Sequence, residues 1–414
     1  MSKQTASPLL DEINPSSRRF NLLTFFFLYI AQSIPKSFFS TLIPVIMRQE
    51  NFELSTIGIM QLIKLPWILK FLWSPYVDRK CQSVGDYKRW ILGSELIYAL
   101  SIFLVAFMDY TVDFKGIIFL IFISFAASAT QDIATDALAV LSFNHKEKSL
   151  VNSMQSMGSF GGVMIGSGLL MLLFQQLGWS TILPYVGLFV VLAIIPLLCN
   201  KGLRIKEKKP QQLASRRDIL YFFTQKEQPI WKQIVFLFLF YSGIIGTLAM
   251  LKPYLVDQGY QTKEIGFIFG IVGTAVGFIA SFAGGFIVRK LGRYRSRILF
   301  ASLILASTIY FRIILAIPHS TALLYLGVIL LWSSYGMATI IVYTTAMDFV
   351  RPGKEGTDFT IQTVITHLSS MLVAIGSGFV AEKLGYLSLA SFEIGLAGLS
   401  LLYILIAFKK PQYD

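Results

Sequence analysis

Apolar runs of about 18 or more residues, the length that crosses a bilayer as an α-helix, recur along the whole chain. Short polar gaps separate these runs. The pattern predicts twelve membrane-spanning helices, with limits near 20–46, 54–77, 89–108, 115–141, 150–175, 180–200, 231–255, 264–288, 297–317, 321–347, 361–381 and 387–408. The chain is therefore expected to be an all-α integral membrane protein.

The longest polar gap divides the predicted helices into two sets of six. The expected domains are a tail at 1–19, a six-helix bundle at 20–200, a central loop at 201–230, a second six-helix bundle at 231–408 and a tail at 409–414.

Composition supports a membrane protein and excludes a secreted disulfide scaffold. Hydrophobic residues make up 55% of the chain and charged residues only 14%, too few to cover a soluble surface. The two cysteines, Cys81 and Cys199, cannot form a disulfide framework. The polar first 19 residues lack the apolar core of a cleaved signal peptide. We expect a multi-pass protein of a cell membrane.

The positive charges predict the orientation. With both termini in the cytoplasm, the tails and cytoplasmic loops hold 26 of the 36 Lys and Arg residues, and the external loops hold four. The positive-inside rule therefore favours cytoplasmic termini. The net charge of +13 is spread over short loops, which argues against a nucleic-acid partner.

The two halves repeat several features. The first helix carries Pro35-Lys36 and the seventh carries Lys252-Pro253. A basic segment follows the second helix at 78–80, and another follows the eighth helix within 284–297. These corresponding features predict two parallel repeats, the organisation of major facilitator transporters.

Polar side chains inside the predicted helices mark a candidate substrate site, because an ionisable group persists in hydrocarbon where it faces a cavity or a partner. Lys64 lies near the midplane of its helix, whereas Lys36 and Lys252 lie toward the outer third, where they serve the site or snorkel to the interface. Three ammonium groups favour an anionic substrate with a carboxylate. The predicted substrate-binding residues are Gln32, Lys36, Gln61, Lys64, Lys252 and Tyr343.

Two carboxyl groups in the fourth helix, Asp132 and Asp136, lie one turn apart and repel each other unless one is protonated or both meet cations. One interpretation is proton coupling, and the other is an ion pair with Lys70 or Arg79. Lys70 itself is expected to pair with one of these acids. The predicted proton-coupling set is Asp132, Asp136, Asp348 and His367, although His367 also fits a packing role.

Three stretches resemble known transporters. KLPWILKFLWSPYVDRK (64–80) and ATQDIATDA (129–137) resemble segments of AmpG-type muropeptide permeases and the related acetyl-coenzyme A transporters. RPGKEGTDFTIQ (351–362) is more similar to the RhtX/FptX siderophore permeases. The resemblance covers both halves and implies the major facilitator fold.

The resemblance also implies a cytoplasmic gate. Asp78 and Arg79 occupy the acidic and basic positions of the superfamily's loop between the second and third helices, with Ser74 in place of the usual glycine. In the equivalent loop of the second half Arg293 matches the pattern. Arg289 stands where an Asp is expected, so this second latch lacks its carboxylate or borrows one elsewhere. Asp358 completes the predicted gating set.

We therefore expect a secondary active importer that works by alternating access, coupled to protons, with a siderophore as substrate. A muropeptide is the alternative, and an acyl-CoA-type solute is a weaker one. No GxxxxGK[ST] loop is present, which disfavours ATP drive. An integral-membrane acyltransferase is disfavoured because no His–acid pair or metal-ligand cluster occurs. We expect no cofactor, no metal and a monomer whose partners are a solute, protons and the bilayer.

Overall fold

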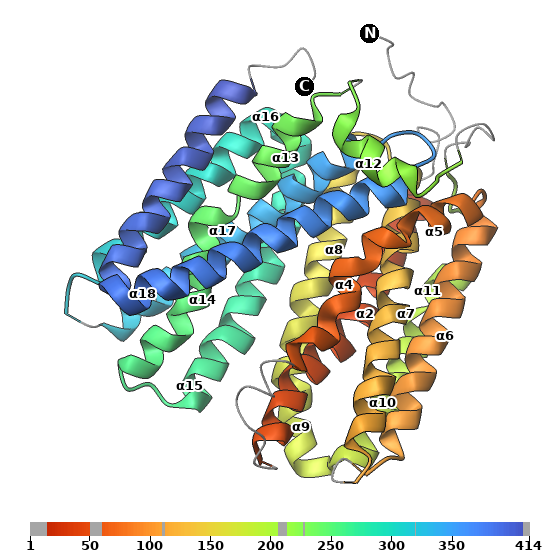
Figure 1. The fold of residues 1–414 in the computed structure, drawn as a ribbon, viewed down its shortest axis with the longest axis horizontal. Helices are drawn as coiled ribbons and strands as arrows, with labels where there is room; N and C mark the ends of the chain where they lie inside the picture. Colours follow the sequence, from red (N-terminus) through yellow and green to blue (C-terminus); the bar gives the residue numbers. More distant parts are fainter. Residues whose placement is uncertain are drawn as a thin grey trace. The chain divides into compact units, whose positions relative to one another are not determined.

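The computed structural model describes residues 15–49, 60–109, 112–205, 213–226, 228–318 and 320–408. Every regular element in these ranges is a helix (Figure 1). The predicted all-α membrane fold is therefore confirmed.

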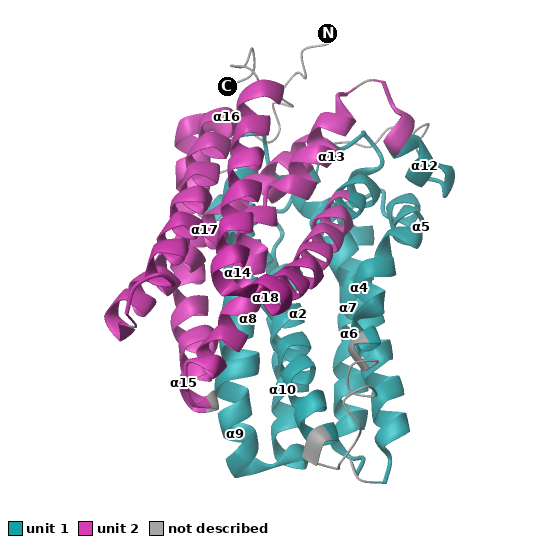
Figure 2. Ribbon diagram, turned by 60° about the vertical axis from the view of Figure 1, so that its left-hand side comes forward, with its two compact units in different colours: residues 1–222, 350–361 teal, residues 223–349, 362–414 magenta. Residues whose placement is uncertain are grey.

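The chain forms two compact units, coloured separately in Figure 2. Unit 1 consists of residues 1–222 and 350–361, and unit 2 of residues 223–349 and 362–414. The first unit thus includes a short segment from late in the sequence, the segment in which α18 begins.

The helices of the first half are α2 (Pro15–Gln49), η1 (Met60–Lys64), α4 (Leu65–Leu69), η2 (Lys70–Leu72), α5 (Ser74–Lys80), α6 (Val84–Ala106), α7 (Phe114–Ser142), α8 (Lys148–Val163), η3 (Met164–Leu169), α9 (Leu170–Leu177), α10 (Trp179–Ala193) and α11 (Ile195–Cys199). The helix α12 (Arg217–Thr224) lies within the predicted central loop.

The helices of the second half are α13 (Ile230–Leu239), α14 (Ser242–Asp257), α15 (Thr262–Phe267), η5 (Ile268–Gly273), α16 (Thr274–Ile314), α17 (Thr321–Asp348) and α18 (Glu355–Ala407).

Nine helical stretches of the described chain are long and apolar enough to cross a membrane. Two of them each contain a reversal at a single glycine, Gly292 in α16 (φ 79°) and Gly385 in α18 (φ 80°). Glycine tolerates this left-handed backbone because it has no Cβ. Each of these stretches thus holds two helices, which is consistent with the twelve that hydropathy predicts.

The second predicted helix, 54–77, is wrong as one continuous helix. Its described part consists of four short pieces, η1, α4, η2 and α5. Pro66 and Pro75 are the second residues of α4 and α5, and the helix breaks just before them because proline has no N–H to bond to the preceding turn. The predicted residues 54–59 lie outside the described part of the chain.

Close packing of α8 and η3 against α2 fixes the polar residues of α2 in unit 1. Gly158, Gly162 and Gly166 face α2 at intervals of four residues. A Cβ at Gly162 would lie 2.9 Å from the carbonyl carbon of Ser33, so any side chain there would force the helices apart. Small residues permit such backbone contact in membrane helices.

Candidate functional site

A buried ion pair lies in unit 1 between the broken second helix and α7. The ammonium group of Lys70 contacts the carboxylate of Asp132, and the two side chains are only 2% and 7% exposed. The expectation that Lys70 pairs with an acid of the fourth helix is confirmed. Since each charge neutralises the other, the pair can persist away from water.

Asp136 lies one turn further along α7 and is held by neutral donors. Its Oδ1 accepts hydrogen bonds from the Tyr29 hydroxyl (2.8 Å) and the Gln155 amide (3.2 Å). Its Oδ2 is buried and has no hydrogen-bond partner among the described residues. No described Lys or Arg pairs with Asp136, so the alternative of an ion pair is wrong for this carboxyl.

Lys36 on α2 lies over the indole ring of Trp67. Its Nζ is 3.8 Å from the ring centroid, and the Nζ of Lys70 is 5.4 Å from the same ring. Lys36 is half-buried, and within the described ranges its ammonium makes no hydrogen bond or ion pair. Its charged neighbours are Asp132, Lys70 and Lys64. Lys64, the last residue of η1, is also half-buried.

Gln32 lies one turn before Lys36 on α2 and is buried. Its backbone carbonyl accepts a hydrogen bond from the Tyr98 hydroxyl (3.2 Å), and its side-chain oxygen meets no donor in the described structure. The side chain of Gln61 lies outside the described part of the chain. Unit 1 therefore brings Lys36 and Lys64 together, with Gln32 next to Lys36 along α2.

Unit 2 contains the remaining predicted substrate residues. Lys252 on α14 is exposed, and its Nζ lies 5.2 Å from the ring centroid of Phe269. Tyr343 on α17 is half-buried, and His367 on α18 is exposed.

Asp348 and Arg293 form an ion pair in unit 2. The Nε of Arg293 donates to Oδ2 of Asp348 at 2.9 Å, directly after the reversal at Gly292. Of the two alternatives for this loop, the borrowed carboxylate is confirmed, and α17 supplies it.

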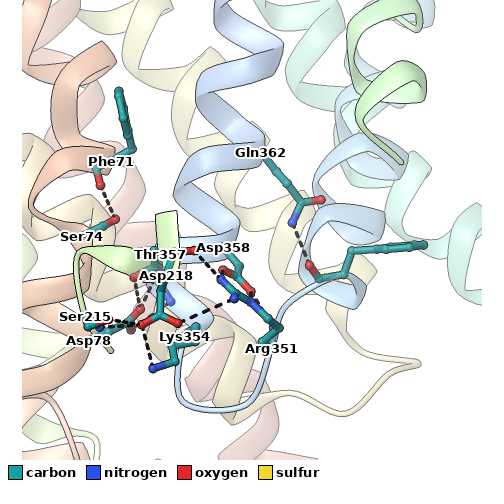
Figure 3. A network of polar contacts seen from close by, with 12 residues as sticks. Phe71, Ser74, Asp78, Ser215, Asp218, Arg351, Lys354, Thr357, Asp358 and Gln362 are labelled. Atoms are coloured by element: carbon teal, nitrogen blue, oxygen red, sulfur yellow. Dashed lines mark hydrogen bonds and ion pairs between the residues drawn. The ribbon is translucent and has the colours of Figure 1, made fainter. Parts of the chain in front are cut away.

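Asp78 caps the beginning of α18, as Figure 3 shows. The buried carboxylate accepts hydrogen bonds from the backbone N–H groups of Gly356 (3.0 Å) and Thr357 (2.6 Å), and from the Thr357 hydroxyl (2.7 Å). The first N–H groups of a helix have no partner within it, and its N-terminus is partially positive. A carboxylate satisfies both needs. Arg79 is exposed and takes no part in these contacts.

Arg351, which sequence reasoning missed, holds Asp358. Its Nε and Nη2 donate to the two carboxylate oxygens of Asp358 at 2.8 and 2.6 Å. Such a bidentate pair is stronger and more directional than a single ion pair. The signal in the sequence was that Arg351 lies only seven residues before Asp358, across a short turn.

The helix α12 of the central loop joins this network through Asp218 (Figure 3). Asp218 lies 3.1 Å from the Nζ of Lys354 and 3.7 Å from Nη1 of Arg351, and accepts the backbone N–H of Ser215 at 2.7 Å. Burial acts to raise the pKa of Asp218. The hydrogen bonds from Ser215 and Lys354 outweigh burial and lower this pKa below its usual value. The carboxylate therefore stays ionised at neutral pH.

The sequence of this chain matches a known protein family. Residues 22–374 match the family described as the Major Facilitator Superfamily. The chain belongs to this superfamily. It is accordingly a multi-pass membrane transporter.

Its relatives within the superfamily include bacterial permeases. The chain is 24% identical to "Putative transporter AmpG 3" of Rickettsia prowazekii, over 83% of this chain and 85% of that protein. It is 22% identical to "Anhydromuropeptide permease" of Escherichia coli K12, over 92% of this chain and 79% of the permease. The crystal structure of the human organic anion transporter MFSD10 (TETRAN) covers 94% of this chain and 100% of its own, with 14% identity and a TM-score of 0.71. That likeness shows the fold alone.

Within this superfamily member, the described residues contain no group of three His, Cys, Asp or Glu side chains that would hold a metal ion. The polar centres described above consist instead of ion pairs, caps and lysines over aromatic rings.

The buried pair predicts a strong coupling between Lys70 and Asp132. Lys70→Met or Asp132→Asn alone leaves one buried charge without its partner and is expected to destabilise the protein by about 3–5 kcal/mol. The double variant removes both charges and is expected to be more stable than either single variant. Thermal unfolding of the purified proteins in detergent measures this difference. Additive losses would contradict the coupling.

The cap predicts that Asp78→Asn loosens the start of α18. The variant loses the charge and one acceptor oxygen, a cost of about 1–2 kcal/mol. In a background without Cys81 and Cys199, a cysteine placed at Ala137, beside Gly356, is expected to react faster with a soluble maleimide.

The matched control for this cap is Lys80→Gln, because Lys80 is exposed in the same short helix and makes no hydrogen bond or ion pair with the described residues of α18. Equal labelling rates in Asp78→Asn and the parent protein would refute the capping role.

Proposed function

We propose that this transporter imports muropeptides, peptidoglycan fragments that carry peptide carboxylates, across the bacterial inner membrane by alternating access. The carrying observation is that Lys36, half-buried in unit 1, has an aromatic ring as neighbour and no ion-pair partner in the described structure. An unpaired ammonium group in this setting suits an anionic solute. The names of the bacterial relatives favour a muropeptide as that solute.

The expectation of a siderophore is not supported by these relatives. It came from the stretch 351–362. There Arg351, Lys354 and Thr357 bind Asp358, Asp218 and Asp78 respectively, and these contacts support a role in holding the start of α18.

The proposed ligand contacts are the polar side chains that the sequence predicts. Lys36 and Lys64 attract carboxylates, and the unpaired amide oxygen of Gln32 accepts hydrogen bonds from peptide N–H groups. The full proposed set is Gln32, Lys36, Gln61, Lys64, Lys252 and Tyr343. The relatives are transporters, and we propose no catalytic activity.

Asp136 is the proposed proton carrier. Lys70 already neutralises Asp132, so a charged Asp136 would hold its second oxygen buried without a partner, which is costly. A protonated Asp136 avoids this cost. Asp348 is engaged by Arg293 and His367 is exposed, so neither is as well placed for the role in this conformation.

Both termini are proposed to lie in the cytoplasm, on the strength of the Lys and Arg distribution. The gate is accordingly proposed at the cytoplasmic end, where Asp78 and Asp358 hold the start of α18 and Arg293 holds Asp348. A single chain is proposed to be the working unit.

Uptake into proteoliposomes tests the substrate. With an imposed pH gradient, purified protein is expected to accumulate a labelled anhydromuropeptide in preference to a ferric siderophore or acetyl-coenzyme A. Lys64→Ala is expected to lower uptake roughly tenfold or more, because a charge contact to the ligand is lost. Lys115→Ala, at an exposed position of α7, is the control. Accumulation of the siderophore instead would overturn the proposal.

Asp136→Asn tests proton coupling. The amide still accepts the Tyr29 hydrogen bond yet carries no proton for transport, so accumulation against a gradient is expected to stop while counterflow continues. Asp113→Asn, at the exposed start of α7, is expected to behave as the parent protein. If Asp136→Asn still accumulates solute to the parent level, Asp136 is not the carrier.

A further inference from the structure

Two lysines lie near the ring of Trp67, and they differ in their charged partners. Lys70, 5.4 Å from the ring centroid, is neutralised by Asp132. Lys36, 3.8 Å from the same centroid, has no carboxylate partner among the residues that the structure describes. The ring of Trp67 therefore lies beside one lysine that forms an ion pair, Lys70, and one that forms none in the described structure, Lys36.

A ring and a carboxylate hold an ammonium group in different ways. A carboxylate fixes its position and cancels its charge, whereas the face of an indole fixes its position through the ring quadrupole and leaves the net charge unchanged. An ammonium held in this way is ordered before the ligand arrives and still attracts an anion. Order of this kind lowers the cost of binding.

The second unit contains the same combination. Lys252 lies 5.2 Å from the ring centroid of Phe269 and makes no hydrogen bond or ion pair in the described ranges. Lys36 and Lys252 occupy the first and seventh predicted helices, and Trp67 and Phe269 the second and eighth. In two parallel repeats these are equivalent helices. The pairing thus occurs in both repeats, with the tighter contact in unit 1.

We propose that Trp67 is a positioning residue, which holds the Lys36 ammonium group in place for an anionic group of the substrate without neutralising it, and that Phe269 does the same for Lys252. This proposal rests on the proposed function only for the identity of the ligand. The contact between ring and ammonium is independent of which solute is carried.

The residue type at position 67, tryptophan, supports this role. Tryptophan offers the strongest cation-binding face among the aromatic side chains. Its Nε1 is buried and has no acceptor among the described residues, so hydrogen bonding does not account for an indole at this position. By contrast, Nε1 of Trp179 donates to the carbonyl of Val105 at 2.9 Å. Trp179 is therefore a matched control, a buried tryptophan whose indole N–H is already engaged in a hydrogen bond.

Fluorination of the indole ring provides the test, because it weakens the ring quadrupole stepwise with little change in size. Fluorotryptophans with one to four fluorine atoms are incorporated at residue 67, and uptake of labelled anhydromuropeptide into proteoliposomes is measured. The logarithm of KM is expected to rise in proportion to the number of fluorine atoms, by roughly tenfold over the series, at constant maximal rate. The same series at residue 179 is expected to leave KM unchanged.

The sign of the effect separates two roles of the ring. Fluorine makes the indole N–H a better donor, so a fall in KM would mean that Trp67 donates a hydrogen bond to the ligand, and the proposal would be wrong. An unchanged KM would also overturn it. Phe269→Leu is expected to raise KM with the maximal rate retained, and an unaltered KM there would limit the role to unit 1.

A second readout needs no substrate. Reductive methylation of Lys36, followed by mass spectrometry, is expected to be several-fold faster in Trp67→Leu than in the parent protein, with exposed Lys115 as internal reference. Faster methylation without any muropeptide uptake by the parent protein would refute the proposed function and support the positioning role. Normal muropeptide uptake, together with an unchanged methylation rate and a KM that does not vary with fluorination, would support the proposed function and refute the positioning role.

Discussion

The ion pair between Lys70 and Asp132 is the contact on which the polar interior of unit 1 depends. In a hydrocarbon setting every charge needs a partner within the protein, because the bilayer core offers no water. This pair neutralises one cation of the second helix, Lys70, and one anion of α7, Asp132. What remains is an acid whose hydrogen-bond donors are neutral, Asp136, and a cation that lies over a ring without an ion-pair partner in the described structure, Lys36. The two proposed functions of unit 1, proton carriage and anion binding, therefore follow from one neutralisation.

A different principle governs the network around 350–361. Here the partners of the carboxylates are backbone N–H groups, a guanidinium and the ammonium group of Lys354. Asp78 satisfies the start of α18, while Arg351 engages both Asp358 and Asp218. The carboxylates act on a helix terminus and on a turn, so the network constrains where the backbone begins its helix. That is a mechanical role, distinct from the chemistry of ligand or proton binding.

Much of this structure could be predicted from the sequence. Hydropathy located the helices, since a span is a property of composition over about twenty residues. The partner of Lys70 followed from the cost of a buried charge. The contact of Arg351 with Asp218 could not be predicted, because it joins α12 in the central loop to a segment more than a hundred residues later. The breaks in the second helix were also missed, although Pro66 and Pro75 were visible, because proline is tolerated in many membrane helices.

The broken second helix has a consequence for the winding of the chain. Lys64, Trp67 and Lys70 are spaced three residues apart, and they are distributed over a 3₁₀ turn, a short α-helical piece and a second 3₁₀ turn. Residues three apart line up along a 3₁₀ helix but drift around a regular α-helix. The two lysines thus lie in the 3₁₀ turns that bound the α-helical piece carrying Trp67. A local change in winding at either turn would move an ammonium group relative to the ring without altering any side chain, so the backbone itself can set how strongly this segment attracts an anion.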